Sequence, residues 1–330
     1  MRSPQGFEKM IRNMECFENK EGVKILQIRN QDTQGNGTMS FYEVMPGITL
    51  TYNDFHMAKV KSDFIPSEEI FCVDYCREGR IEQEISKGVF RYVGTNDIRL
   101  DNRKNHATDF FFPLSHYHGI TIQFELDKAD KSIRRMMPEF PVSVDNIRQK
   151  YCAEDSCSYL RNETYLEHIF EELYHVPALA PKQYMTLKSL ELLICLWNMN
   201  ESDISEPITY FAKSQTDKVK AICELISKNL KKHYTVEELA EKYQLSATGM
   251  KNTFKGIYGK PIYTYLQEKR MERAAILMKE GNMSILDIAC EVGYESPSKF
   301  SAAFKKIMNL TPTEFRSQGS ILVSDRNSDV

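Results

Sequence analysis

The chain has 330 residues, which exceeds a typical single domain and favours two or three domains. Apolar residues make up 42% and charged residues 27%, as expected for ordinary folded domains. The total charge is −3, but residues 217–316 hold 17 Lys and Arg against 12 Asp and Glu, a net of +5, so the remainder carries −8. A basic C-terminal third beside an acidic remainder indicates two different functions in one chain.

The first thirty residues contain no apolar core of a signal peptide. The most apolar run, residues 190–199, is too short to span a bilayer and carries Glu191. We therefore expect a cytoplasmic protein without a membrane partner. None of the eight cysteines forms a C-x-x-C pair, and most lie in apolar contexts, so buried free thiols are expected rather than disulfides.

Taken in chain order, the N-terminal third is rich in β patterns. One amphipathic segment surrounds residues 7–17, and residues 31–40 are expected to form a polar, Gly-containing loop. From 41 to about 126 the chain has short alternating runs separated by glycines, which predict an antiparallel sandwich or barrel of six or more strands. We assign residues 1–135 to this β-rich regulatory domain.

Helical patterns follow. Apolar spacing predicts helices over 131–137, 144–151, 161–175 and 182–199, within a helical segment that we assign to residues 136–213. These helices either cover the sheet or present an apolar stripe as the seam of a homodimer. The polar stretch 201–215, with Pro207, is the expected domain boundary.

The C-terminal part contains two copies of nearly the same sequence pattern. A helix-turn-helix pattern begins at Thr235, and a second begins 49 residues later at Ser284. In each copy a Thr or Ser precedes a short helix, and a second Ser opens a helix whose apolar residues fall four apart. Glu238 completes a capping box with Thr235. Matching caps and core spacing in two copies indicate a duplicated structural unit.

The second helix of each copy has a polar outer face. At about 100° per residue, Met250, Phe254 and Ile257 share the inner face of the first, and the corresponding inner residues of the second are Phe300, Phe304 and Ile307. The residues that point outward are Thr248, Asn252 and Lys255 in the first copy and Ser298, Ala302 and Lys305 in the second. These faces lack acidic residues, as a helix in the major groove of DNA requires; a solvated helix face is the alternative.

A long helix, predicted over 262–279 between Pro261 and Gly281, joins the two copies. Its length of roughly 27 Å is close to one turn of B-DNA at about 34 Å, so it would hold the two outer faces in successive major grooves. Arg270 and Arg273 on this helix would meet backbone phosphate or clamp the two copies through ion pairs, with phosphate favoured for Arg270.

The span from about Asp217 to Arg316 closely resembles the AraC/XylS family of bacterial transcription regulators. The family signature reads Ile285-x-x-Ile288-Ala289-x-x-x-Gly293-Tyr294, Ser298-x-Phe300-x-x-x-Phe304-Lys305-Lys306 and Thr311-Pro312-x-x-Phe315-Arg316. Asn309 stands where the family usually has Gly and can take the same left-handed conformation. The resemblance implies that the DNA-lining residues are Thr248, Lys251, Asn252 and Lys255 in the first copy and Ser298, Lys299 and Ala302 in the second. Ala302 offers only a methyl group, so we expect the second helix to read fewer bases than the first.

The expected fold class is therefore α+β. An N-terminal antiparallel β-rich sensor domain is followed by helices and then by an all-α DNA-binding domain, residues 214–317, of two helix-turn-helix subdomains. We expect residues 318–330 to be a disordered tail. Double-stranded promoter DNA is the implied partner, with RNA polymerase if the protein is an activator.

The family further implies a small-molecule effector bound by the β-rich domain. Polar and cationic side chains among aromatics could receive an anionic or aromatic effector, although cross-strand pairing with Glu82 and Glu84 is the alternative. The arginines that could receive it are Arg77, Arg80, Arg91 and Arg99. The site residues that we assign are Arg77, Arg80, Tyr92, His116 and His118.

His116 and His118 are predicted to alternate on one face of a strand, but two ligands on one strand do not make a metal site, and we assign no metal or cofactor. A metal-dependent cupin-like enzyme using these histidines, fused to a DNA-binding module, is the competing hypothesis. The sequence contains no nucleophile motif and no complete phosphate loop. We therefore expect no enzymatic activity.

Overall fold

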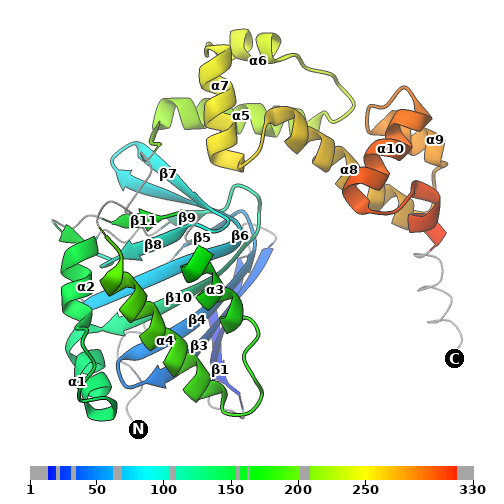
Figure 1. Cartoon of the computed structure of the whole chain (residues 1–330). Coiled ribbons are helices and arrows are strands. Elements are labelled where there is room, and N and C mark those ends of the chain that lie inside the picture. Colours follow the sequence, from blue (N-terminus) through cyan, green and yellow to red (C-terminus); the bar gives the residue numbers. More distant parts are fainter. Residues whose placement is uncertain are drawn as a thin grey trace, which may run out of the picture. The chain divides into compact units, whose positions relative to one another are not determined.

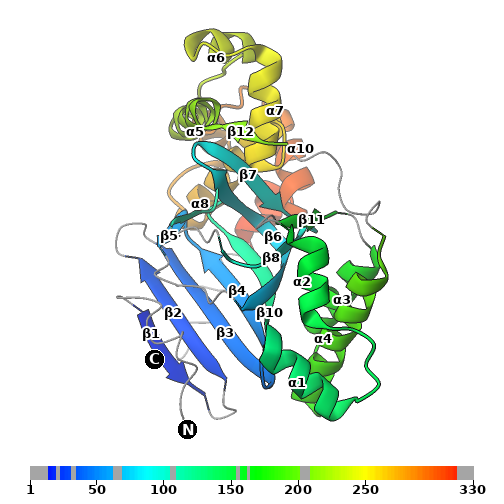
Figure 2. The same cartoon turned by 90° about the vertical axis from the view of Figure 1, so that its left-hand side faces the viewer.

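A computed structural model describes residues 14–19, 23–30, 35–61, 69–104, 109–153, 157–161, 164–200 and 209–317. The chain divides into two compact units, Met1–Tyr210 and Phe211–Val330 (Figures 1 and 2). The predicted tail, 318–330, and residues 7–13 of the predicted amphipathic segment lie outside the described residues.

The first unit is built on antiparallel strands, which confirms the predicted β-rich class. Its strands are β1 (Met14–Glu18), β2 (Lys24–Asn30), β3 (Gly35–Met45), β4 (Ile48–His56), β5 (Lys59–Lys61), β6 (Ile70–Ser86), β7 (Val89–Gly94), β8 (Ile98–Asp101), β9 (Asp109–Phe111), β10 (Tyr117–Glu125) and β11 (Ser158–Leu160). The main path runs β1-β2-β3-β4-β10-β6-β7, while β8 and β9 also pair with β6. The long strand β6 therefore joins several parts of the sheet.

The predicted loop over residues 31–40 is wrong for residues 35–40, which belong to β3. This strand pairs with β2 on one side and β4 on the other, so its backbone groups are satisfied despite the polar side chains. A Cβ at Gly37 would lie 2.6 Å from the Phe55 ring. The glycine therefore permits a close approach across the sheet rather than a turn.

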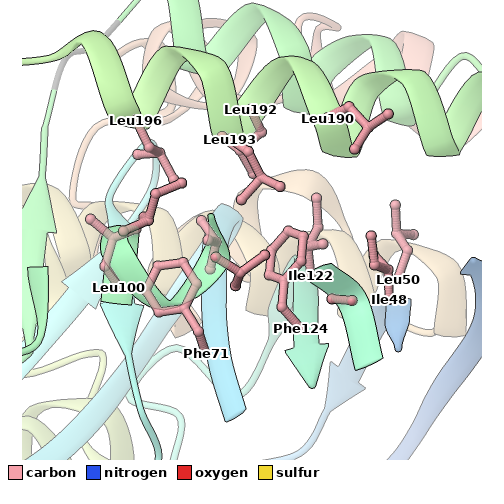
Figure 3. Close-up of a cluster of buried hydrophobic side chains, with 14 of the residues drawn as sticks. Ile48, Leu50, Phe71, Leu100, Ile122, Phe124, Leu190, Leu192, Leu193 and Leu196 are labelled. Carbon is pink, nitrogen blue, oxygen red and sulfur yellow. The ribbon is translucent and has the colours of Figure 1, made fainter. Parts of the chain in front are cut away.

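Four helices lie together on one side of the sheet (Figures 1 and 2). They are α1 (Leu126–Met136), α2 (Val144–Tyr151), α3 (Thr164–Leu173) and α4 (Pro181–Asn198). The last three are close to the predicted ranges, whereas α1 begins five residues before the predicted 131. Leu192, Leu193 and Leu196 of α4 are fully buried and face Ile122 and other sheet residues (Figure 3). The predicted covering of the sheet is thus confirmed.

The other face of the strands encloses a second apolar cluster. Phe55 and Phe112 stack at its centre with ring centroids 5.2 Å apart, and Tyr117 lies beside both. Side chains alternate along each strand, so the two clusters draw on alternate residues of the same strands.

The second unit is helical. After β12 (Phe211–Ala212) it contains α5 (Lys213–Lys228), α6 (Val236–Lys242), α7 (Ala247–Tyr258), α8 (Ile262–Glu280), α9 (Ile285–Glu291) and α10 (Pro297–Met308). Residues 312–317 form one more helical turn. In α5, Thr216 is fully buried and its hydroxyl donates to the Lys213 carbonyl at 2.9 Å.

The predicted caps of the duplicated units are confirmed. Thr235 and Glu238 form a reciprocal capping box at α6, and Ser246 accepts a bond from the Gly249 amide at α7. Ser284 and Ser296 cap α9 and α10 in the same way. Among the helices of the described residues, none is both long and apolar enough to cross a membrane.

Candidate nucleic-acid interface

The rotation of α7 is fixed by its apolar side. Met250, Phe254 and Ile257 are fully buried, as predicted. The Phe254 ring contacts the rings of Tyr258 and Tyr265, with centroids 4.5 and 5.6 Å away. These contacts prevent the helix from turning about its axis, so the opposite residues are held toward solvent.

The outer face of α7 carries the four predicted residues. Thr248, Lys251, Asn252 and Lys255 are all exposed, and the helix contains no acidic residue. No intramolecular hydrogen bond or ion pair is found for these four side chains within the described parts of the chain. Two ammonium groups, an amide and a hydroxyl are thus available to a ligand.

The second copy repeats this arrangement with fewer polar groups. Phe300 and Phe304 are fully buried, and Phe304 contacts Phe315 with ring centroids 5.5 Å apart. Ile307, predicted to face inward, is half-buried against the same cluster. The exposed residues of α10 include Ser298, Lys299, Ala302 and Lys305, with Lys306 beside them. Asn309 adopts the predicted left-handed conformation, with φ of 60°, where the helix ends.

The structure corrects the prediction that Arg270 meets phosphate. Only 6% of Arg270 is exposed, and burial lowers the pKa of its guanidinium. Its Nε donates to the Leu230 carbonyl at 2.8 Å and its Nη2 to the Lys232 carbonyl at 3.4 Å. Arg270 is therefore a clamp, the second role predicted for it, but it acts through carbonyls instead of ion pairs.

The same clamp joins the two copies. The segment that holds Leu230 and Lys232 leads into α6, and His233 Nε2 lies 3.0 Å from the Gly293 carbonyl of the second copy. Gly293 has φ of +86°, and a Cβ there would lie 2.9 Å from the Lys231 carbonyl and 3.0 Å from Arg270 Nη2. The signature glycine thus permits the close approach that fixes one copy against the other.

In the first unit, four of the five predicted effector residues contact different groups. Arg77 pairs with Glu171 at 3.4 Å and lies over the Tyr174 ring, while the buried Tyr92 donates to Glu82 at 2.5 Å. Burial lowers the pKa of Arg80. His116 Nδ1 lies 3.2 Å from the Leu114 carbonyl, and His118 Nε2 lies 2.5 Å from Asp54.

The structure therefore does not join His116 and His118 into one site. His116 precedes β10, which begins at Tyr117, so the predicted alternation on one strand face is wrong. The enzyme hypothesis rested on this pair and has no support in the geometry.

Sequence reasoning missed a cluster of buried charges in the sheet. Asp101 is 2% exposed and accepts from Arg103 at 3.0 Å and from Arg99 at a shorter distance. Arg103 also donates to Asp74 at 2.6 Å. Burial alone would raise the pKa of Asp101, but Arg99 and Arg103 hold it well below its usual range. A run such as IRLDNR marks these residues only as charged, because their pairing depends on the sheet.

Arg91, one of the arginines that the sequence offers to an effector, is buried. Its guanidinium lies 3.1 Å from the centre of the Tyr159 ring, and it is 4% exposed. Its Nη1 is buried without a hydrogen-bond partner among the described residues, and burial lowers its pKa to about 10. Tyr159 in turn donates to Gln83 at 2.9 Å. A buried cation beside two polar side chains can receive an anionic group.

Comparison with known proteins identifies the family of the second unit. Residues 239–318 match the model of a helix-turn-helix domain family. The transcription factor PqrA of Proteus vulgaris is 35% identical over 86 residues, which are 26% of this chain and 70% of that protein. The chain belongs to the AraC-type helix-turn-helix regulators.

Two further proteins are similar to part of this AraC-type chain. An AraC-like transcription regulator of Streptomyces lividans is 36% identical over 83 residues, covering 25% of this chain and 27% of that protein. The C-terminal domain of the response regulator AraT from Geobacillus stearothermophilus is 31% identical, covering 31% of this chain and 84% of that one, with a TM-score of 0.30.

The match covers only part of the length of the curated AraC-type relatives. Two other curated regulators are matched over 43% and 40% of their own lengths. The family model itself begins at residue 239, inside α6, so the first unit of this AraC-type chain lies outside it.

Proposed function

We propose that the chain is a sequence-specific DNA-binding transcription regulator in which α7 and α10 enter successive major grooves of promoter DNA. The observation that carries this proposal is the pair of exposed, acid-free faces on two capped helices whose opposite sides are fully buried. The clamp of Arg270 and Gly293 supports it, because a rigid pair of helices suits two grooves at a fixed distance.

The length of α8 agrees with this spacing. The helix has 19 residues, or about 28 Å at about 1.5 Å per residue, against about 34 Å for one turn of B-DNA. The side chains of α7 and α10 are long enough to cover the remaining distance to the two grooves.

The side chains of α7 match the chemistry of base edges. The Asn252 amide can both donate to and accept from the major-groove edge of adenine, while Lys251 and Lys255 can meet phosphates or guanine. On α10, Ala302 offers only a methyl group, which fits against a thymine methyl. We therefore assign most base discrimination to α7 and most anchoring to α10.

The test begins with selection of DNA fragments from the source genome by the purified chain. Asn252→Ala should then lose about 1–3 kcal/mol of binding at one base pair and relax the preference there. Asn282→Ala, an exposed asparagine in the loop after α8, is the control and should bind as the parent does. A uniform loss across all sequences would make Asn252 a backbone contact, and failure to select any fragment at low salt would overturn the proposal.

We also propose that the first unit binds a small anionic effector at Arg91. A buried guanidinium with an unpartnered Nη1 is costly, and a carboxylate or phosphate would complete its hydrogen bonding. Compounds from a library of small organic anions that raise the melting temperature of the parent should not raise that of Arg91→Gln. Arg135→Gln, at an exposed residue of α1, is the control. Hits that stabilise all three proteins equally would exclude Arg91.

The outer side of α4 supports a homodimer. Leu187, Ile194 and Trp197 are 61%, 38% and 41% exposed and lie along one side of the helix, away from the leucines buried on the sheet. A second copy would cover this stripe and remove apolar surface from water. Leu187→Glu with Trp197→Glu should convert a dimer to a monomer in analytical ultracentrifugation. A parent protein that is monomeric at micromolar concentration would exclude this seam.

A further inference from the structure

Three side chains with metal-binding atoms meet on the first unit. Asp54 and His56 lie on β4, and His118 lies on the neighbouring strand β10. Asp54 and His118 are register partners across the two strands. Because residues two apart share a face, His56 projects from the same side of the sheet as Asp54. The three positions are therefore set by the sheet.

The ligand atoms converge on one point. Nε2 of His118 lies 2.5 Å from Asp54 Oδ1, and Nε2 of His56 lies 2.9 Å from that same oxygen. All three atoms lie within 4.8 Å of one another, and the two imidazole rings meet edge to face with centroids 5.7 Å apart. Two imidazole nitrogens and one carboxylate oxygen therefore lie close enough together to share one cation.

The backbone beside His118 is shaped for this placement. The pairing of β10 with β6 shifts register between His118 and Gly119, which marks a β-bulge. A bulge changes the direction of a side chain relative to a regular strand. A Cβ at Gly119 would lie 2.5 Å from the Tyr75 carbonyl, so glycine is needed for the strands to approach there. The bulge and the glycine together hold His118 beside β4.

We propose that Asp54, His56 and His118 form a binding site for a divalent first-row transition metal ion such as Zn²⁺, Ni²⁺ or Co²⁺. Two neutral imidazoles and one carboxylate suit these ions, whereas Ca²⁺ and Mg²⁺ prefer oxygen ligands throughout. Metal–nitrogen bonds of about 2.0–2.1 Å place tetrahedral ligand atoms roughly 3.3 Å apart. The side chains need to open by less than about an ångström, and His56, 59% exposed, has room to do so.

Three protein ligands leave at least one coordination position for water or for a donor atom of a small molecule. The bound ion would also cross-link β4 to β10. It would therefore stabilise the folded first unit in proportion to its concentration above the dissociation constant. The site shares no residue with the Arg91 site or with α7 and α10, so the proposals above neither require it nor depend on it.

The test uses the untagged full chain, with Cys16→Ser and Cys290→Ser to remove the two exposed thiols. After treatment with a chelator, Ni²⁺ is titrated by isothermal calorimetry, and the melting temperature is followed in parallel. We expect one Ni²⁺ per chain and a higher melting temperature with Ni²⁺. His118→Gln and Asp54→Asn should each weaken binding by at least about tenfold.

His168→Gln is the matched control, because His168 lies 3.5 Å from Glu172 as a single exposed histidine–carboxylate pair. It should bind Ni²⁺ as the parent does. Circular dichroism verifies folding, and His56→Gln, at the most exposed ligand, provides a variant least able to disturb the sheet. Absence of Ni²⁺ binding by the parent, or unchanged stoichiometry and affinity in the folded His56 and His118 variants, would overturn the proposal.

Discussion

The two units of the chain bury different kinds of side chains. In the second unit, the buried residues of the described part are apolar apart from Thr216, Thr253 and Arg270, and the lysines of α7 and α10 lie outside. The first unit buries both signs of charge, including Asp101 and Arg99. A unit that holds charge inside can complement a small ligand, whereas a unit that holds charge outside can meet a large polyanion.

The largest loss of stability should follow from replacing Asp101. Asp101→Asn removes the carboxylate that neutralises Arg99 and Arg103, leaving buried cations with one anionic partner fewer. We expect a loss of about 3–5 kcal/mol in the free energy of unfolding of the first unit. Urea denaturation followed by tryptophan fluorescence measures this, since Trp197, on α4, belongs to the first unit.

The pH dependence of this effect has a definite sign. The pKa of Asp101 is lower in the folded than in the unfolded chain, so its stabilisation is full above the unfolded value of about 4 and is lost as pH falls further. The difference between parent and variant should therefore be constant from about pH 5 to 8 and shrink below about pH 4. Asp127→Asn, at an exposed carboxylate of α1, should show neither effect. Equal stability of both variants at pH 7 would contradict a structural role for the buried pair.

Arg270 should have the next largest effect, because it is the one cation that the described part of the second unit buries. Arg270→Met keeps the length of the side chain but leaves the Leu230 and Lys232 carbonyls without their donor. We expect a loss of about 1–3 kcal/mol in unfolding free energy, together with weaker DNA binding. Arg273→Met, three residues along α8 and exposed, is the control for the loss of stability. If the Arg273 variant instead lost as much stability, the carbonyl contacts would not be the cause.

The second unit was largely predictable because its information is local. Apolar residues at helical spacing and Ser or Thr at the caps predicted α6, α7, α9 and α10, and the exposures of Asn252 and Ala302 followed from that periodicity. The burial of Arg270 was not predicted, because a cation on a helix gives no local sign that it will be buried.

The first unit was predictable only as a class. Alternating runs predicted antiparallel strands, but the pairing of β4 with β10 brings together residues 64 apart in sequence, Asp54 and His118. The alternation of Asp54 and His56 was visible in TYNDFH, but the third ligand was not. Partners across a sheet depend on strand order, and Arg91 and Asp101 gained their partners in the same way.

The N-terminal caps of α7 and α10 allow the two copies within the second unit to be compared. Ser246 accepts from the Gly249 amide at 3.1 Å, and Ser296 accepts from the Lys299 amide at 3.4 Å. Ser246→Ala and Ser296→Ala should each cost about 1 kcal/mol, with the larger loss at the shorter bond of Ser246. Thermal unfolding of the two variants, with Thr313→Ala at an exposed residue as the control, measures this difference. A larger loss at Ser296 would show that bond length is not the deciding factor.

The smallest effects on stability should be those of single exposed lysines. Their effect on DNA binding should depend on salt, unlike the effect of Asp101 on the stability of the first unit. Lys255→Gln and Lys305→Gln should leave stability nearly unchanged but should each lower the slope of log affinity against log salt by about 0.9, the release of one counterion. Lys228→Gln, whose ammonium is 71% exposed and pairs with Glu224, is the control and should keep the parent slope. A change at Lys255 alone would restrict DNA contact to α7. The stability lost in Asp101→Asn should in contrast vary little with salt, because buried charges are screened much less than exposed ones.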